Sequence, residues 1–258
     1  MADDDRGTPP DGRTATTDER GGTDADATPP SDLPHTVLVH GAGTGGWVWD
    51  EVRSHLRGTS TAVDLPLHEP GCTPSACADL IAESLGARPS SPVLMVLHSW
   101  AGGLAGMLAE RLGARLVHVV YLSAVIPEDG STFADTLPIP QRWILRLLYS
   151  RNREGLRPSD AMIRREYCND LSEAQAEDVV RRFTTQRPEP FLTPVAGPPT
   201  APPSTYIHLS VDRSVPPSLQ RRSARRLREP TLRSIDAGHL AMLSRPAEVA
   251  AILNEVCE

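Results

Sequence analysis

Residues 93–103 read VLMVLHSWAGG, an apolar run that stops at the hydroxyl of Ser99 and continues into small residues. Apolar side chains then recur at helical spacing as far as Leu112. The pattern predicts a strand, a sharp turn and a helix, with Ser99 lifted out of the sheet at the turn. Small residues at Ala101 and Gly102 let the strand and helix backbones approach closely. Ser99 is therefore the candidate nucleophile, and the structural alternative is a serine that caps a core helix.

Short apolar runs alternate with helical patterns on both sides of this stretch. Strands are predicted at residues 36–40, 62–66, 93–97, 116–122, 205–211 and 231–235. Near-continuous apolar strands separated by helices are typical of a parallel sheet whose two faces are both covered. The predicted fold class is α/β, with a mostly parallel, doubly wound sheet.

Composition divides the chain into a tail, a core and an insertion. Residues 1–33 have almost no apolar side chains to bury, so a disordered tail is expected. Residues 34–126 and 204–258 carry the strands and are expected to form the core. Residues 127–203 carry helical patterns without strands and end in a proline-dense return. This insertion is predicted to be a helical cap.

Charge and cysteine usage narrow the classes of function. The formal net charge is −7, and every basic residue is a dispersed arginine, which disfavours nucleic-acid binding. The four cysteines form no C-x-x-C pair, so neither zinc, nor a disulfide framework, nor any other cofactor is expected. Apolar runs are too short for a membrane span, and the acidic N-terminus is unlike a signal peptide. A cytoplasmic protein with a small-molecule substrate is expected, and the sequence leaves open whether it is a monomer or a homodimer.

Three polar residues come in the order nucleophile, acid, base. Ser99, Asp212 and His239 each lie just past the carboxyl end of a predicted strand, where a parallel sheet collects its functional residues. A serine hydroxyl becomes a good nucleophile when a neutral imidazole takes its proton, and a carboxylate fixes the tautomer of that imidazole. Each residue alone has a structural explanation, but their shared order and position indicate a catalytic triad.

A glycine-rich loop at residues 41–46 follows the first predicted strand. Gly41, Gly43 and Gly46 fit the G-x-G-x-x-G spacing of a dinucleotide site, but this spacing alone is a weak signal. Such a loop can instead present a backbone N–H to a developing oxyanion, and the sequence favours this use.

The chain resembles the α/β-hydrolase superfamily from about residue 35 to its end. The shared motifs are His40-Gly41-Ala42 with Trp47 and Trp49, His98-Ser99-Trp100-Ala101-Gly102-Gly103, Ser204-Thr205-Tyr206 before Asp212, and Gly238-His239 with Ser244-Arg245-Pro246. The similarity is to the small-cap branch that contains hydroxynitrile lyases, methyl-salicylate-type esterases and bacterial relatives. The resemblance implies an α/β-hydrolase fold and an oxyanion hole made by the backbone N–H groups of Ala42 and Trp100.

The chain departs from this branch at two places that bear on function. Leu97 and Ala101 replace the glycines of the G-x-S-x-G elbow, which questions how tight the turn is but leaves the nucleophile in place. Hydroxynitrile lyases carry a lysine beside the catalytic histidine, whereas Leu240 follows His239 in a chain without lysine. Cyanogenic lyase activity is therefore not expected. His98 is expected to pack and hydrogen bond beneath the elbow.

The expected function is a serine hydrolase that cleaves a small to medium apolar ester, lactone or thioester through an acyl-enzyme. The alternative is a non-hydrolytic lyase or cyclase that acts on a natural product with the same three residues. A ligand receptor or inactive scaffold is a third class, against which an intact triad argues. The candidate pocket residues are Gly41, Trp143, Leu147, Tyr167, Phe183 and Leu240.

Overall fold

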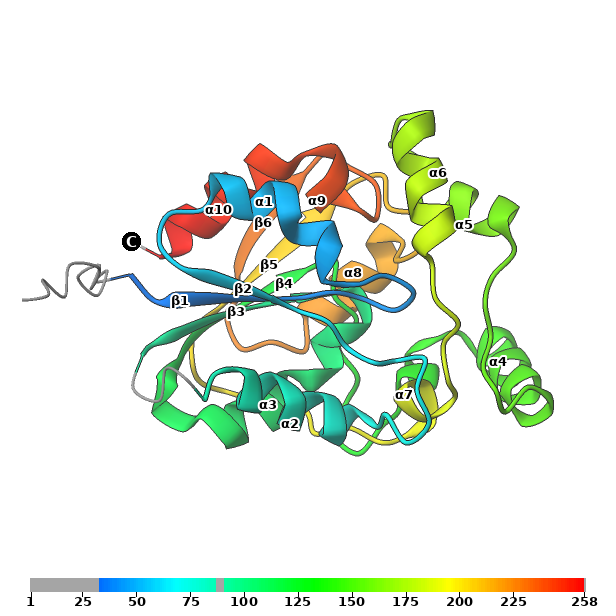
Figure 1. Ribbon diagram of the computed structural model, residues 1–258. Coiled ribbons are helices and arrows are strands. Elements are labelled where there is room, and N and C mark those ends of the chain that lie inside the picture. Colours follow the sequence, from blue (N-terminus) through cyan, green and yellow to red (C-terminus); the bar gives the residue numbers. More distant parts are fainter. Residues whose placement is uncertain (1–32, 87–90, 258) are drawn as a thin grey trace, which may run out of the picture. The chain divides into compact units, whose positions relative to one another are not determined.

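A computed structural model describes residues 33–86 and 91–257, and within them six strands form one parallel sheet. The sheet order is β2-β1-β3-β4-β5-β6 (Figure 1). The strands are β1 (His35–Val39), β2 (Ser60–Val63), β3 (Val93–His98), β4 (Leu116–Leu122), β5 (Ser204–Leu209) and β6 (Thr231–Ile235). The predicted α/β class with a parallel sheet is confirmed. Of the expected tail, residues 1–32 lie outside the described part of the chain.

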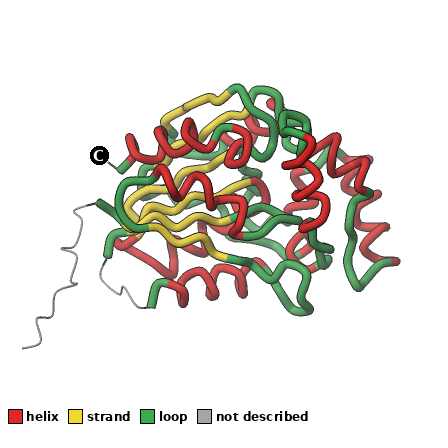
Figure 2. The backbone as a smooth tube through the Cα atoms, turned by 45° about the horizontal axis from the view of Figure 1, so that its top comes forward, coloured by secondary structure: helices red, strands yellow, loops and turns green. Residues whose placement is uncertain are grey.

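Helices cover the sheet on both faces, as Figure 2 shows. The α-helices of the core are α1 (Asp50–His55), α2 (Pro74–Ser84), α3 (Ala105–Leu112), α8 (Pro217–Ala224), α9 (Ala241–Ser244) and α10 (Pro246–Val256). Short 3-10 helices are η1 (Gly46–Trp49), η2 (Ser99–Leu104), η3 (Gly113–Arg115) and η4 (Phe133–Thr136). No helix among the described residues is long and apolar enough to span a membrane.

Alternate residues of the central strands β1, β3 and β4 belong to different apolar cores, because successive side chains point to opposite faces of a sheet. In β1, Val37 and Val39 pack in the core that contains residues of α2 and α3. Leu38, between them, packs in the core that contains residues of α1, α9 and α10. Both faces of the central strands are therefore buried, which explains why their sequences are apolar throughout.

Helix starts follow the capping signals of the sequence. Thr73 caps α2 by accepting a hydrogen bond from the Ala76 amide at 3.2 Å, and Pro74 stands at the first helical position. In α6 (Glu173–Arg182), Ser172 and Gln175 form the predicted capping box.

The chain between β4 and β5 contains four α-helices. They are α4 (Ile139–Arg151), α5 (Asp160–Tyr167), α6 and α7 (Glu189–Leu192). These helices lie beyond the carboxyl ends of the strands in Figure 1. We refer to residues 127–203 as the cap.

The order in which the chain adds strands to the sheet reverses between β1 and β3. From β1 the chain crosses to β2 on one side, and β3 then pairs with β1 on the other side. In open α/β sheets, ligands bind in the crevice outside the carboxyl ends of the strands at such a point. The glycine-rich loop follows β1 and Ser99 follows β3, so both expected parts of the site meet here.

Candidate active site

Ser99 has a backbone φ of 55°, in the left-handed region that side chains other than glycine rarely adopt. Holding a residue there costs on the order of 1–3 kcal/mol, which the surrounding structure must offset. Two neighbouring glycines make the turn possible. A Cβ added to Gly41 would lie 2.7 Å from the Ser99 Cβ, and one added to Gly102 would lie 2.7 Å from the carbonyl oxygen of Val125. The elbow is therefore strained and closely packed.

The turn is sharp although Leu97 and Ala101 stand where an elbow usually has glycine. The close backbone approaches fall at Gly41 and Gly102 instead, so glycine is not required at the two usual positions. The predicted helix from Trp100 to Leu112 differs in one respect. It begins as the 3-10 helix η2 and becomes α-helical only at Ala105.

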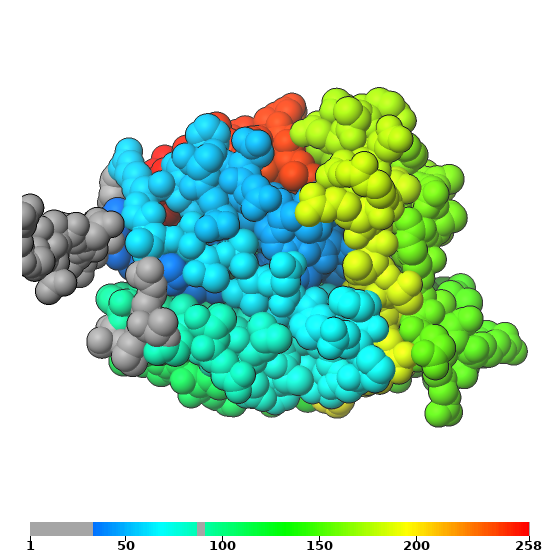
Figure 3. All heavy atoms as spheres, viewed as in Figure 1, coloured from blue at the N-terminus to red at the C-terminus, as the bar shows by residue number. Residues whose placement is uncertain are grey.

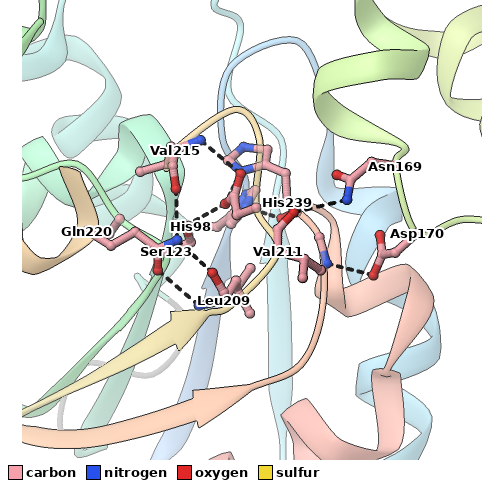
Figure 4. A network of polar contacts seen from close by, with 12 residues as sticks. His98, Ser123, Asn169, Asp170, Leu209, Val211, Val215, Gln220 and His239 are labelled. Atoms are coloured by element: carbon pink, nitrogen blue, oxygen red, sulfur yellow. Dashed lines mark hydrogen bonds and ion pairs between the residues drawn. The ribbon is translucent and has the colours of Figure 1, made fainter. Parts of the chain in front are cut away.

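Asp212 holds the ring of His239 in a defined orientation. The His239 Nδ1 and Asp212 Oδ2 atoms are 2.7 Å apart, and both side chains are buried. Because a carboxylate only accepts hydrogen bonds, Nδ1 carries the proton and Nε2 is left with a free lone pair. Ser123 donates to the same carboxylate oxygen at 2.6 Å, and the Val215 amide donates to Oδ1 at 2.8 Å (Figure 4).

Ser123 was not among the residues that the sequence singled out. It follows the carboxyl end of β4 directly, just as Ser99 follows β3. The signal that pointed to the triad also applied to Ser123 and could have found it.

His98 contacts the loop that carries His239. Its Nε2 donates to the backbone carbonyl of His239 at 3.0 Å, and the two ring centroids are 4.6 Å apart. Burial, reinforced by the neighbouring His239, lowers the pKa of His98 well below its ordinary value. A neutral His98 does not oppose a positive charge on His239. Figure 4 shows both rings in one polar network.

Ser99 lines a cavity to which the loop after Asp212 contributes Ser214 and Val215. Ser99 lines it together with Tyr167, and the Tyr167 ring packs edge-on against the His239 ring with centroids 5.2 Å apart. Among the described residues, no hydrogen bond joins Ser99 Oγ to His239. Such contacts are often long without substrate and tighten when it binds.

The peptide units Gly41–Ala42 and Ser99–Trp100 are expected to form the oxyanion hole. In each, the carbonyl oxygen accepts at least one hydrogen bond that fixes the orientation of the unit. The Gly41 carbonyl accepts from His40 Nδ1 at 2.7 Å and from Thr44 Oγ1 at 3.1 Å. The Ser99 carbonyl accepts from the Val125 amide at 2.8 Å. In a trans peptide the N–H points away from the preceding C=O. These bonds therefore fix the directions of the Ala42 and Trp100 N–H groups.

His40 can donate from Nδ1 because its other ring nitrogen accepts. The Leu65 amide donates to His40 Nε2 at 2.8 Å, which places the proton on Nδ1. Burial lowers the pKa of His40, so the ring stays neutral and keeps this tautomer.

Two consecutive residues of the cap tie together the loops that carry the acid and the base. Asn169 Nδ2 donates to the Val211 carbonyl at 3.0 Å, next to Asp212. Asp170 Oδ2 accepts from the Gly238 amide, next to His239, and from Ser244 Oγ, both at 2.7 Å. Figure 4 shows this link from the cap to both loops. No motif in the sequence marked Asn169 or Asp170.

The cavity over Ser99 has a volume of about 440 Å³ and a largely apolar wall. All three phenylalanines of the chain line it, and so do two of its tyrosines. These aromatic residues are Phe133, Phe183, Phe191, Tyr149 and Tyr167. Ala42 and Trp100, the residues expected to form the oxyanion hole, line the same cavity as Ser99.

The structure divides the six candidate pocket residues. Tyr167 and Phe183 line the cavity. Trp143 and Leu147 instead lie on the outer face of α4, with 67% and 49% of their surface exposed. Helical spacing predicted the helix but could not tell which of its faces meets the cavity. Leu240 is fully buried in the core, and Gly41 packs beneath Ser99 rather than on the cavity wall.

Comparison with known proteins agrees with this geometry. Residues 36–252 match the alpha/beta hydrolase family. The chain is 24% identical over 253 residues to Methylesterase 10 of Arabidopsis thaliana, covering 87% of this chain and 92% of that protein. It is 24% identical over 257 residues to polyneuridine aldehyde esterase of Rauvolfia serpentina, covering 87% of this chain and 96% of that protein.

Solved structures share the fold. An extracellular alpha/beta-hydrolase from a Paenibacillus species matches with a TM-score of 0.76 and 18% identity, covering 87% of this chain and 99% of that chain. A pyrethroid hydrolase from Sphingobium faniae matches with a TM-score of 0.67 and 23% identity, covering 87% of this chain and 97% of that chain. Since the family match spans most of the sequence, this chain belongs to the alpha/beta hydrolase family and is an enzyme of the serine hydrolase type.

Proposed function

We propose that this enzyme hydrolyses small to medium apolar carboxylic esters, lactones or thioesters through an acyl-enzyme on Ser99. One observation carries the proposal. The 2.7 Å hydrogen bond from His239 Nδ1 to Asp212 leaves Nε2 as the base, and the His239 ring packs against Tyr167, which lines the cavity together with Ser99. A strained serine, a neutral oriented imidazole and a buried carboxylate are the three groups that acyl transfer requires.

In the proposed first step, Ser99 Oγ attacks the carbonyl carbon of the ester and its proton passes to His239 Nε2. The oxyanion that forms accepts hydrogen bonds from the N–H groups of Ala42 and Trp100. Asp212 stabilises the positive charge on His239. Collapse of the intermediate breaks the bond to the leaving oxygen, which takes the proton from His239 and departs as the alcohol.

The second step reverses these roles with water. His239 Nε2 takes a proton from a water molecule, which attacks the acyl carbon and re-forms the oxyanion in the same hole. Breaking the bond to Ser99 Oγ releases the carboxylic acid, and the serine regains its proton from His239.

The apolar, aromatic wall of the cavity favours substrates that carry an aromatic or branched apolar group. Six aromatic residues, Trp100 among them, contribute to the wall, whereas aromatic residues make up only 4% of the chain. Pockets of such size and polarity bury most of the surface of a small ligand. The name of the relative Methylesterase 10 supports a small alcohol as the leaving group.

Intact-protein mass spectrometry during turnover tests the proposal. The protein is mixed with p-nitrophenyl esters of increasing acyl length, beside the variant Ser99→Ala. We expect an acyl adduct on the wild-type protein that appears and decays as nitrophenol is released. We expect neither adduct nor release with Ser99→Ala.

Two outcomes would contradict the proposal. Turnover that persists in Ser99→Ala would mean that another residue is the nucleophile. A wild-type protein that reacts at Ser99 with a fluorophosphonate but hydrolyses no ester of the series would favour the lyase or cyclase alternative.

A further inference from the structure

Cys72 and Cys77 form a pair of thiols outside the active site. Their Sγ atoms are 3.0 Å apart. Cys72 is 6% exposed and Cys77 is 1% exposed, and both thiols are free. Neither residue lines the cavity over Ser99.

The start of α2 explains why the two thiols meet. Thr73 is the N-cap of this helix and Pro74 its first residue, so Cys72 directly precedes the cap and Cys77 is the fourth helical residue. Side chains at these two positions pack against each other in a hydrophobic staple, which fixes how the chain enters a helix. The staple here consists of two sulfur atoms. Four residues separate the two cysteines, so they do not form a C-x-x-C motif.

We propose that Cys72 and Cys77 are an oxidation site, at which a peroxide converts the two thiols into a disulfide. A disulfide has an S–S distance of about 2.05 Å, so the sulfur atoms need to approach by only about 1 Å. Packing at the start of α2 already holds them side by side. Such a disulfide would form with little rearrangement of the fold.

The two cysteines have different parts in the reaction. A hydrogen bond from the Cys77 thiol lowers the pKa of Cys72, against the opposing effect of burial. The same hydrogen bond, together with burial, raises the pKa of Cys77. Cys72 is therefore the thiol of the pair that ionises more readily, and Cys77 is the one that keeps its proton. The thiolate is the form that reacts with peroxide.

The reaction proceeds in two balanced steps. The Cys72 thiol gives up its proton, its sulfur attacks one oxygen of hydrogen peroxide, and the O–O bond breaks. The leaving hydroxide takes up the proton that Cys72 released, so sulfenic acid and one water molecule form. The Cys77 sulfur then attacks the sulfenic sulfur, the S–O bond breaks, and the hydroxyl leaves as a second water molecule with the proton from Cys77. Two thiols are oxidised and one peroxide is reduced to two waters.

The disulfide would link the start of α2 to the loop that the cap rests on. In that loop, the Leu67 carbonyl accepts a hydrogen bond from the Arg187 amide at 3.0 Å. Figure 3 shows the loop before α2 beside the yellow return of the cap. A cross-link here restricts the unfolded chain, so the oxidised protein should melt at a higher temperature than the reduced protein.

Peptide mapping after mild oxidation tests the site. Reduced full-length protein is treated with hydrogen peroxide, denatured, alkylated with iodoacetamide and digested with trypsin. The chain has no lysine and Arg88 precedes proline, so one peptide, residues 58–111, carries Cys72 and Cys77 and neither of the other cysteines. We expect this peptide to lose two hydrogens and take up no alkyl group. The peptides with Cys168 and Cys257 should remain alkylated.

Single variants provide the matched controls. Cys77→Ser should give sulfenic or further oxidised Cys72 without a cross-link, and its melting temperature should not rise on oxidation. Cys72→Ser should leave Cys77 unoxidised. The proposal is overturned if wild-type peptide 58–111 is alkylated at both cysteines after peroxide, if Cys72 is overoxidised instead of cross-linked, or if it pairs with Cys168 or Cys257.

Discussion

His40 acts on the proposed oxyanion hole through a peptide bond, without lining the cavity. Its donation to the Gly41 carbonyl fixes the direction of the Ala42 N–H. We expect His40→Leu to lower kcat by up to about 10²-fold with little change in KM, because the Ala42 N–H stabilises only the transition state and no longer does so once it is misdirected. Steady-state kinetics with a p-nitrophenyl ester measures both constants.

Thr44→Val is the matched control, since it removes only the second donor to the same carbonyl and keeps the shape of the side chain. Its kcat should fall less than that of His40→Leu. Equal kcat values for wild type and a folded His40→Leu protein would show that the hole does not depend on this hydrogen bond.

Asp212, unlike Ser123, fixes which nitrogen of His239 carries the proton. Asp212→Asn can no longer select the tautomer of His239 in which Nε2 is free, so kcat should fall on the order of 10⁴-fold. Ser123→Ala removes one donor to the same carboxylate but keeps the pair with His239. Its loss should be about tenfold, the equivalent of one hydrogen bond.

The kinetics of both variants, with circular dichroism to confirm folding, measure this difference. A near-normal rate in Asp212→Asn would mean that another residue is the acid of the triad. Glu128 and Asp129, which follow β4, are the alternatives in sequence, but they bond to Arg226 and to the Gly197 amide respectively.

At the scale of elements, the cap and the catalytic loops are joined by Asn169 and Asp170. Asp170→Ala leaves the Gly238 amide and the Ser244 hydroxyl without their acceptor. We expect a loss of about 1–3 kcal/mol in the free energy of unfolding and a lower kcat, because the loop carrying His239 loses its anchor. Denaturant unfolding and ester kinetics measure the two effects.

Asp160→Ala is the control from the same cap, because Asp160 pairs only at the surface with Arg157. It should change stability by less than about 1 kcal/mol and leave kcat unchanged. If Asp170→Ala also left kcat unchanged, its contacts would serve the packing of the cap alone.

Helix α4 has one buried and one exposed face, and only residues of the buried face are expected to affect substrate binding. Tyr149 is buried and lines the cavity, whereas Trp143 on the same helix is 67% exposed. Tyr149→Leu should raise KM for an aromatic ester about five- to tenfold, because the loss of an aromatic contact is worth about 1 kcal/mol. Trp143→Leu should leave KM unchanged. Equal changes in KM would mean that the outer face of α4 also contacts substrate.

Strands and helix caps were predictable because their signals are local. The runs at 116–122 and 231–235 coincide with β4 and β6, and Thr73 with Pro74 starts α2 as the sequence indicates. The wall of the cavity was harder to predict. Spacing marks an apolar helix, but packing against distant segments decides which face is covered, so spacing alone could not show that Trp143 is exposed.

Contacts between distant segments explain what the sequence did not reveal about the site. Ser99, Asp212 and His239 each follow a strand, and parallel strands bring their carboxyl ends together, so their convergence could be inferred. Asn169 and Asp170 lie in the cap, far from any strand end. Their partners, the Val211 carbonyl and the Gly238 amide, are backbone groups that leave no trace in the sequence.

For the whole molecule, buried histidines set how stability depends on pH. Burial is the largest cause that lowers the pKa of both His40 and His98. Below an ordinary pKa of about 6.5, the unfolded chain therefore binds more protons than the folded chain, and stability falls as the pH falls. We expect each histidine to contribute a loss of up to about 1.4 kcal/mol per pH unit from pH 6.5 downward.

Urea unfolding at several values between pH 7 and pH 5 measures this slope, and His98→Gln should make it shallower. The window excludes Asp135, whose pKa is lowered to about 2 despite opposing desolvation, because hydrogen bonds and charge from Thr132 and Arg146 favour its ionised form. Its contribution disappears only near and below the ordinary pKa of a carboxyl, about 4. A slope unchanged in His98→Gln would assign the pH dependence to other groups.

The strained backbone at Ser99 also bears on how such a chain evolves. The φ of 55° suits glycine better than serine, so the fold gives up stability to keep a hydroxyl at this point. After gene duplication, a copy freed from selection for activity could replace this proposed nucleophile by glycine, and the replacement would relieve the strain. At this position the free energy of folding favours glycine, and selection for activity is what retains the serine.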